Sequence, residues 1–170
     1  MFQYNDMDEI IDNLWLGNYD SSSNVSMLKN KGIKKVLSVM DYFGGPKYDK
    51  DFIHKRFEIE DNCRQNIIQY FGECLNFIKG NEKILVHCLA GVSRSATIVI
   101  AYLMWTQHLK YKEALEKVKE KRPYVGPNEG FEKQLEMFEK YLIDNDYDIE
   151  KIKFKEIEWK PPKELLDSFY

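Results

Sequence analysis

Residues 83–107 constrain the fold more than any other part of the chain. They begin with KILVHC, a short apolar run with the length of a buried strand. They end with SRSATIVIAYLMWTQ, a helical segment that is apolar on nearly every side. A helix of that kind has to be covered all round, so it lies deep in the fold. The stretch therefore predicts a buried strand, a short loop and a central helix.

The rest of the chain repeats this alternation of strands and helices. Further strands are predicted over residues 9–17, 34–40 and 54–60, and further helices over residues 24–32, 67–78, 111–122 and 128–143. Strands that alternate with helices imply a largely parallel sheet with helices on both faces. We therefore predict an α/β fold.

The length of the chain predicts one domain and a tail. A chain of 170 residues is about the size of one globular domain, which we assign to residues 1–143. Residues 144–170 form a charged C-terminal extension in which the periodic pattern fades. The extension fits a solvated appendage, an extra packed helix or a docking segment equally well, and its role stays open at this point.

Charge and hydropathy exclude several classes of function. The net charge is −3, with Lys and Glu interspersed, so binding to nucleic acid is not expected. The longest apolar run, Ala96–Trp105, is far shorter than the roughly 20 residues of a membrane span. The N-terminal residues lack the pattern of a secretory signal, so we expect a cytoplasmic protein, with the nucleus as a second location.

The three cysteines, Cys63, Cys74 and Cys88, suggest reduced thiols. Their number is odd and their spacing is not that of a metal site, so neither a disulfide framework nor bound zinc is expected. We predict no metal and no cofactor.

The loop between the buried strand and the central helix has the composition of an anion site. Backbone N–H groups at a helix N-terminus bind anions and favour a thiolate, so Cys88 is expected to be a nucleophile with a lowered pKa. Gly91 permits a tight turn, and the planar guanidinium of Arg94 suits two oxygens of a phosphate. The predicted phosphate-binding loop comprises Leu89, Ala90, Gly91, Val92, Ser93 and Arg94.

The segment HCLAGVSRS carries the Cys-x5-Arg signature of the cysteine-dependent protein phosphatases. Three further stretches resemble the dual-specificity branch: NLWLGNYDSSSNVSMLKNKGIKKVLSV, EIEDNCRQNIIQYFGECLNFI and KRPYVGPNEGFEKQLEMFE. The resemblance extends from Met7 to about Ile143. It implies the cysteine-phosphatase fold, with a largely parallel, mixed sheet of about five strands between helices. The chain looks like the small, atypical type that is mostly catalytic domain.

The resemblance also implies a mechanism. Cys88 would attack phosphorus to give a cysteinyl-phosphate, Arg94 would bind the phosphoryl oxygens, and Ser95 would help the thiolate leave in the second step. His87 would orient the loop and tune the thiol. The alternative is a structural role without chemistry, in which Cys88 is a buried cysteine and Arg94 pairs elsewhere.

A general acid has to come from outside the loop. Asp61 follows a predicted strand at the family's general-acid position, and it would protonate the leaving oxygen and then activate water. An Asp there also suits a helix N-cap or a turn, and Glu60 is a second possible acid. Asn128 would cap a helix and, by the resemblance, also brace the loop. Cys63, near Asp61, raises the hypothesis of a reversible disulfide with Cys88.

The predicted substrates are phosphorylated proteins carrying phosphotyrosine, phosphoserine or phosphothreonine. The chain is too short for the additional tyrosine-clamping loop of longer, tyrosine-specific relatives, and the apolar loop residues disfavour phosphoinositides. The alternative function is a non-catalytic module that binds phosphoresidues on the same fold. A monomer is expected. Residue patterns name neither the physiological phosphoprotein nor the preference among Tyr, Thr and Ser.

Overall fold

The computed structural model describes residues 4–41 and 45–167 of the chain. Within these residues five strands form one sheet: β1 (Met7–Ile11), β2 (Leu14–Gly17), β3 (Lys35–Val39), β4 (Ile53–Phe57) and β5 (Ile84–His87). The strand order is β1-β2-β5-β3-β4, with β1 antiparallel to β2 and every other pair parallel. The predicted α/β fold with a largely parallel, mixed sheet is confirmed.

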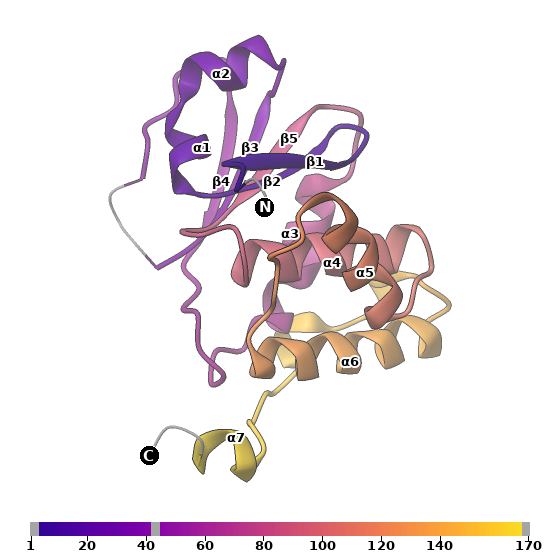
Figure 1. The fold of residues 1–170 in the computed structure, drawn as a ribbon. Helices are drawn as coiled ribbons and strands as arrows, with labels where there is room; N and C mark the ends of the chain where they lie inside the picture. The colour runs from indigo at the N-terminus through magenta and orange to yellow at the C-terminus, as the bar shows by residue number, and fades with distance from the viewer. Residues whose placement is uncertain (1–3, 42–44, 168–170) are drawn as a thin grey trace.

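Helices cover both faces of the sheet, as predicted (Figure 1). One face carries two short helices, α1 (Tyr19–Ser23) and α2 (Val25–Asn30). The other face carries four longer helices: α3 (Phe71–Ile78), α4 (Arg94–Thr106), α5 (Tyr111–Lys121) and α6 (Glu129–Asp144).

Side-chain alternation along the strands divides the core into two parts. Val36 and Leu85 pack with Leu28 of α2 in the smaller cluster. Their neighbours Leu37 and Val86 point the other way, into the large cluster that contains α4. Helix α4 is buried along most of its length, which agrees with its apolar sequence.

The predicted single strand over residues 9–17 was wrong. The structure divides this run into the hairpin β1–β2, and Asn13 between the strands has a φ of 69°. Asn tolerates this left-handed conformation better than most residues, so the chain reverses at the polar pair Asp12–Asn13 between the two apolar stretches.

Two other element boundaries moved. The strand predicted to run to residue 60 ends at Phe57. The helix predicted from residue 67 begins with a 3₁₀ turn, Ile68–Tyr70, before α3. The loop that carries Asp61 lies between β4 and this turn. Residues 61–66 of this connection are called the acid loop.

The C-terminal extension packs against the domain. It contains two 3₁₀ turns, Ile149–Lys151 and Phe154–Glu156, and the short helix α7 (Lys163–Asp167). Four of its apolar residues are buried in the large core cluster: Ile149, Ile152, Phe154 and Ile157. The assignment of residues 1–143 as a separate catalytic unit stays a prediction. In the described part of the chain, no helix is both long enough and apolar enough to span a bilayer.

Candidate active site

The predicted nucleophile lies at the end of the central strand. β5 has β2 and β3 as parallel neighbours, ends at His87 and is followed at once by Cys88. The Cys88 thiol is buried, with 2% of the residue exposed. Its sulfur accepts hydrogen bonds from the backbone N–H of Gly91 at 3.2 Å and from the hydroxyl of Ser95 at 3.1 Å. Both donors stabilise negative charge on sulfur.

The backbone carbonyl groups of residues 89–92 face the outer side of the loop and accept hydrogen bonds there. Each is held by a donor from elsewhere in the chain: Leu89 O by Tyr19 N at 3.0 Å, Ala90 O by Tyr4 Oη at 3.0 Å, Gly91 O by Arg122 Nε at 2.9 Å, and Val92 O by Gly126 N at 2.9 Å. A trans peptide points its C=O and N–H in opposite directions. The following N–H groups, from Ala90 to Ser93, therefore turn toward the inside of the loop, in the arrangement that binds anions.

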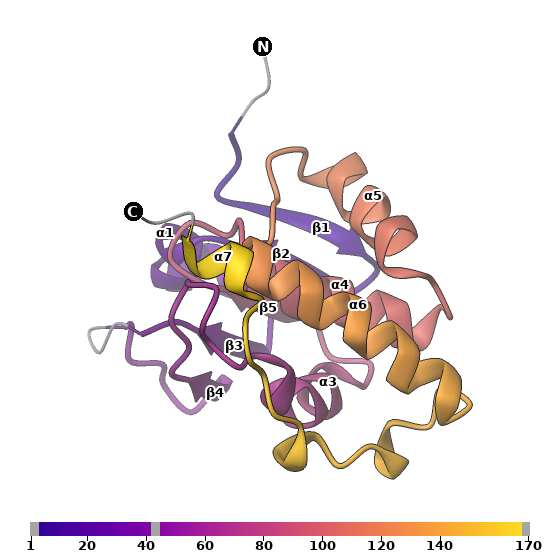
Figure 2. The same cartoon turned by 90° about the horizontal axis from the view of Figure 1, so that it is seen from below.

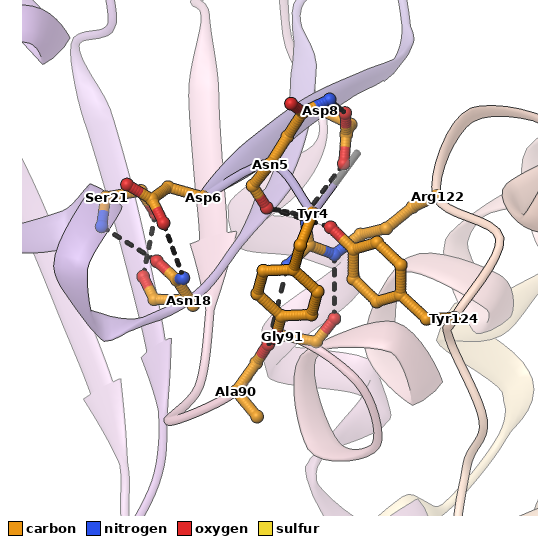
Figure 3. Close-up of polar contacts among 10 residues, drawn as sticks. All are labelled: Tyr4, Asn5, Asp6, Asp8, Asn18, Ser21, Ala90, Gly91, Arg122 and Tyr124. Carbon is orange, nitrogen blue, oxygen red and sulfur yellow. Dashed lines mark hydrogen bonds and ion pairs between the residues drawn. The ribbon is translucent and has the colours of Figure 1, made fainter. Parts of the chain in front are cut away.

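Arg122, which the sequence analysis did not single out, holds this loop from behind (Figure 3). Its guanidinium is fully buried and also donates to Asn5 O at 2.8 Å and to Asp8 Oδ2 at 2.7 Å. The ring of Tyr124 lies against it, at 4.6 Å between the guanidinium carbon and the ring centroid. Arg122 thereby connects the N-terminal segment to the back of the phosphate-binding loop.

Gly91 is required by the geometry of the loop. Its φ is +66°, and a Cβ there would lie 2.6 Å from both Arg122 Nη2 and Gly17 O. A larger residue would strain the backbone and displace the loop from its supports.

The Arg94 side chain is almost buried at the start of α4. Its Nη1 donates to Asp41 Oδ1 at 2.6 Å and to Ile59 O at 3.1 Å. Its Nε is buried and has no hydrogen-bond partner among residues 4–41 and 45–167. The guanidinium holds the pKa of the Asp41 carboxyl below its usual value through that hydrogen bond. Asp41 lies 53 residues away from Arg94 in sequence, and no pattern pointed to it.

Asp61 lies beside the phosphate-binding loop. Its Oδ1 accepts hydrogen bonds from Ser93 Oγ at 2.8 Å and from Asn128 Nδ2 at 2.9 Å. Asn128 also caps α6 by accepting from Phe131 N, and its own N–H donates to Ser93 Oγ at 2.9 Å. The structure thus brings Asp61, Ser93 and Asn128 together. Glu60 instead pairs with Asn62 on the exposed side, at 2.8 Å.

His87 is buried under the loop as a neutral ring. Its Nδ1 donates to Cys88 O at 3.1 Å, which places the accepting nitrogen Nε2 against the Ser38 hydroxyl at 2.6 Å. Burial lowers the pKa of His87 to about 4. The ring therefore acts as a hydrogen-bonded support between β3 and the nucleophile.

This burial of His87 predicts a loss of stability in mild acid. The unfolded chain protonates the ring near pH 6.5, whereas the folded protein resists protonation down to about pH 4. The buried neutral ring therefore makes its full contribution to the free energy of unfolding above pH 6.5, the pKa in the unfolded chain. This contribution is lost as the pH falls toward the pKa of about 4 in the folded protein. Between about pH 7.5 and pH 5 we expect His87 to account for a loss of about 2 kcal/mol in the free energy of unfolding.

Urea denaturation at the two pH values measures this effect. A His87→Gln variant, which does not ionise there, is expected to lack this part of the loss. The exposed His108, substituted in the same way, is the control and should leave the pH dependence as it is. A His87→Gln variant with the full wild-type pH dependence would contradict the interpretation.

All three cysteines are free thiols in the structure. Cys63 is buried in the acid loop, and its Sγ lies 3.9 Å from Leu165 O. A reversible disulfide between Cys63 and Cys88 stays a hypothesis, beside the alternative that Cys63 is an ordinary buried cysteine.

The described geometry accords with comparisons to known proteins. The family model for the dual specificity phosphatase catalytic domain matches residues 14–141. Dual specificity protein phosphatase 1B of Arabidopsis thaliana is 38% identical over 144 residues, which cover 82% of this chain and 86% of the relative. Dual specificity protein phosphatase 22-A of Danio rerio is 40% identical over 139 residues, covering 79% of this chain and 66% of the relative.

Solved structures show the same similarity. The human tyrosine phosphatase-like serine/threonine/tyrosine-interacting protein has a TM-score of 0.77 and 36% identity, over 81% of this chain and 97% of its own. DUSP15 has a TM-score of 0.74 and 31% identity, over 86% and 97%. The chain belongs to the dual specificity phosphatase family of protein phosphatases.

Proposed function

We propose that this phosphatase hydrolyses phosphotyrosine and phosphoserine or phosphothreonine in proteins through a cysteinyl-phosphate on Cys88. One observation carries the proposal. The Cys88 sulfur, the inward N–H groups of the loop and the Asp61 carboxyl are connected by hydrogen bonds to a single loop of the chain. A nucleophile, an anion site and a proton donor are the three parts that the reaction needs.

In the first step the Cys88 thiolate attacks phosphorus. The P–S bond forms as the bond from phosphorus to the tyrosine, serine or threonine oxygen breaks, and Asp61 gives its proton to that oxygen. Asp61 Oδ1 accepts two hydrogen bonds and is therefore the unprotonated oxygen. The proton belongs on Oδ2, which makes Ser93 and Asn128 orienting groups for the acid.

Arg94 and the loop N–H groups bind the phosphoryl oxygens during this transfer. Asp41 and Ile59 O fix one end of the guanidinium, while the buried Nε is the donor that a phosphate oxygen would satisfy. Because these donors are already in place, they stabilise the charge on phosphorus with little rearrangement.

In the second step water hydrolyses the cysteinyl-phosphate. Asp61, now a carboxylate, takes a proton from the attacking water, and the P–S bond breaks as the new P–O bond forms. The leaving sulfur receives a hydrogen bond from the Ser95 hydroxyl, which lies 3.1 Å away. Inorganic phosphate is released and the Cys88 thiolate is restored.

A second candidate function is capture of phosphoresidues without turnover. It draws support from the similarity to the human protein described above as phosphatase-like and interacting. This chain retains Cys88, Arg94 and Asp61 in one arrangement, however, and a module that only binds would not need the acid. Catalysis is therefore the function that the geometry supports better.

Hydrolysis of phosphopeptides in the presence of a metal chelator tests the proposal. We expect the reduced protein to release phosphate from matched phosphotyrosine and phosphothreonine peptides, because no step requires a metal. Binding of both peptides with no phosphate release would replace the enzyme with the binding module. Release of phosphate from the phosphotyrosine peptide alone would show that the protein is specific for tyrosine and contradict dual specificity.

A further inference from the structure

The C-terminal extension returns to the acid loop after leaving α6. The family match ends at residue 141, whereas the chain continues across α3 and then past the start of α6 (Figure 2). Phe154 anchors this course in the core, packing on Phe138 with ring centroids 6.0 Å apart. A Cβ on Gly72 would lie only 2.7 Å from the Phe154 ring, so α3 and the extension are in close contact.

Beyond this anchor, the extension makes hydrogen bonds with the acid loop. Asn66 Nδ2 donates to Ile157 O at 2.8 Å, and Trp159 Nε1 donates to Cys63 O at 2.8 Å. A weaker contact joins Cys63 Sγ to Leu165 O of α7 at 3.9 Å. These contacts bridge about 90 to 100 residues of sequence.

Helix α6 contacts the same loop. Gly130 lies so close that a Cβ there would be 2.5 Å from Cys63 O. Gln134, which is fully buried, donates to Gln65 O at 2.9 Å and accepts from the N–H groups of Ile67 and Ile68 at 2.9 and 3.1 Å. The acid loop thus contacts both α6 and the extension.

We propose that Trp159 is a positioning residue for the general acid, and that the extension braces the acid loop against the phosphate-binding loop. The inference rests on the proposed role of Asp61 as the acid. Trp159 holds the backbone two residues beyond Asp61, so the indole N–H fixes where the carboxyl reaches the leaving oxygen. No group in the extension takes part in the chemistry.

The dependence of the rate on the leaving group isolates this role. A poor leaving group, such as the tyrosine phenolate with a conjugate-acid pKa of about 10, needs the proton from Asp61. A strongly acidic phenol leaves without that proton. The ratio kcat/KM reports the steps up to cysteine phosphorylation, so it measures proton donation apart from hydrolysis of the intermediate.

The test compares Trp159→Phe with Trp105→Phe in the full chain. The substitution at 159 keeps an aromatic ring and removes the indole donor. Trp105 is a matched control because its Nε1 also donates to a backbone carbonyl of the extension, Tyr147 O at 3.0 Å, which lies before the Phe154 anchor and outside the contacts with the acid loop. Asn66→Ala removes the hydrogen bond from the acid loop to Ile157 O of the extension. It provides a second variant if Trp159→Phe is poorly folded. Asp61→Asn is measured alongside.

For Trp159→Phe and Asn66→Ala we expect kcat/KM on phosphotyrosine to fall about twofold to tenfold, because one hydrogen bond contributes a free energy of that size. On the activated aryl phosphate we expect kcat/KM to stay unchanged. Trp105→Phe should leave both values unchanged. Equal losses on the two substrates, or no loss on either, would overturn the brace. If Asp61→Asn showed no leaving-group dependence, the acid assignment itself would fail, and the brace with it.

Discussion

Replacing Cys88 with serine is expected to remove essentially all turnover while leaving phosphopeptide binding in place. A serine hydroxyl is far less ionised than a thiol at neutral pH, so the variant has no effective nucleophile. The loss should approach the whole enzymatic acceleration, which is about 10⁶-fold or more for most enzymes. Arg94 and the loop N–H groups other than that of Gly91 are positioned by contacts that do not involve the sulfur, so they should still bind the phosphoryl group.

Steady-state hydrolysis and calorimetric binding of a phosphotyrosine peptide measure the two halves of this result. Cys74→Ala is the control, because Cys74 lies buried in α3 and should affect stability rather than turnover. Retention of substantial phosphatase activity in Cys88→Ser would show that another group attacks phosphorus.

Replacing Asp61 with asparagine has the second largest expected effect. We expect kcat/KM on phosphotyrosine to fall by about 10²- to 10⁴-fold, the usual contribution of a general acid. The amide oxygen can still accept from Ser93 and Asn128, so the side chain should keep its position while losing the acidic proton.

Glu60→Gln is the matched control for this prediction. Glu60 is the adjacent carboxylate, is exposed and pairs with Asn62 rather than with the phosphate-binding loop. Its substitution should leave kcat/KM on phosphotyrosine unchanged. A large loss of kcat/KM in Glu60→Gln, with a normal value in Asp61→Asn, would transfer the acid role to Glu60.

The central part of the fold was predictable because its signals are contiguous in sequence. Strand β5, the loop after it and α4 follow one another without interruption, and each has a pattern of its own. The hairpin at Asn13 was missed because only two polar residues, Asp12 and Asn13, separate its two short apolar strands, and a single left-handed residue reverses the chain.

The supports of the site were not predictable from local patterns. Arg122 and Asp41 contact the phosphate-binding loop from remote segments, and each looks like an ordinary surface charge in its own sequence. Only the folded chain shows that one is fully buried and that the other pairs with Arg94. Charge type alone does not distinguish a buried support from a solvated side chain.

The packing of the extension was hidden for a related reason. Ile149, Ile152 and Phe154 are separated by charged residues and lie on or next to short 3₁₀ turns, so they produce neither a helical nor a strand period. Their burial depends on contacts with α3 and α6, such as those of Phe154 with Gly72 and Phe138, which form only when the domain folds. The sequence pattern therefore left the role of residues 144–170 open.

The most direct test of the proposed mechanism is to trap the phosphorylated enzyme. The wild-type protein would be mixed with a phosphate-labelled activated aryl phosphate, quenched in acid within the first turnover and digested to locate the label. The mechanism predicts a phosphate on the peptide that contains Cys88, formed together with a burst of the released phenol. Label on any other side chain, or turnover with no label on the protein, would contradict it.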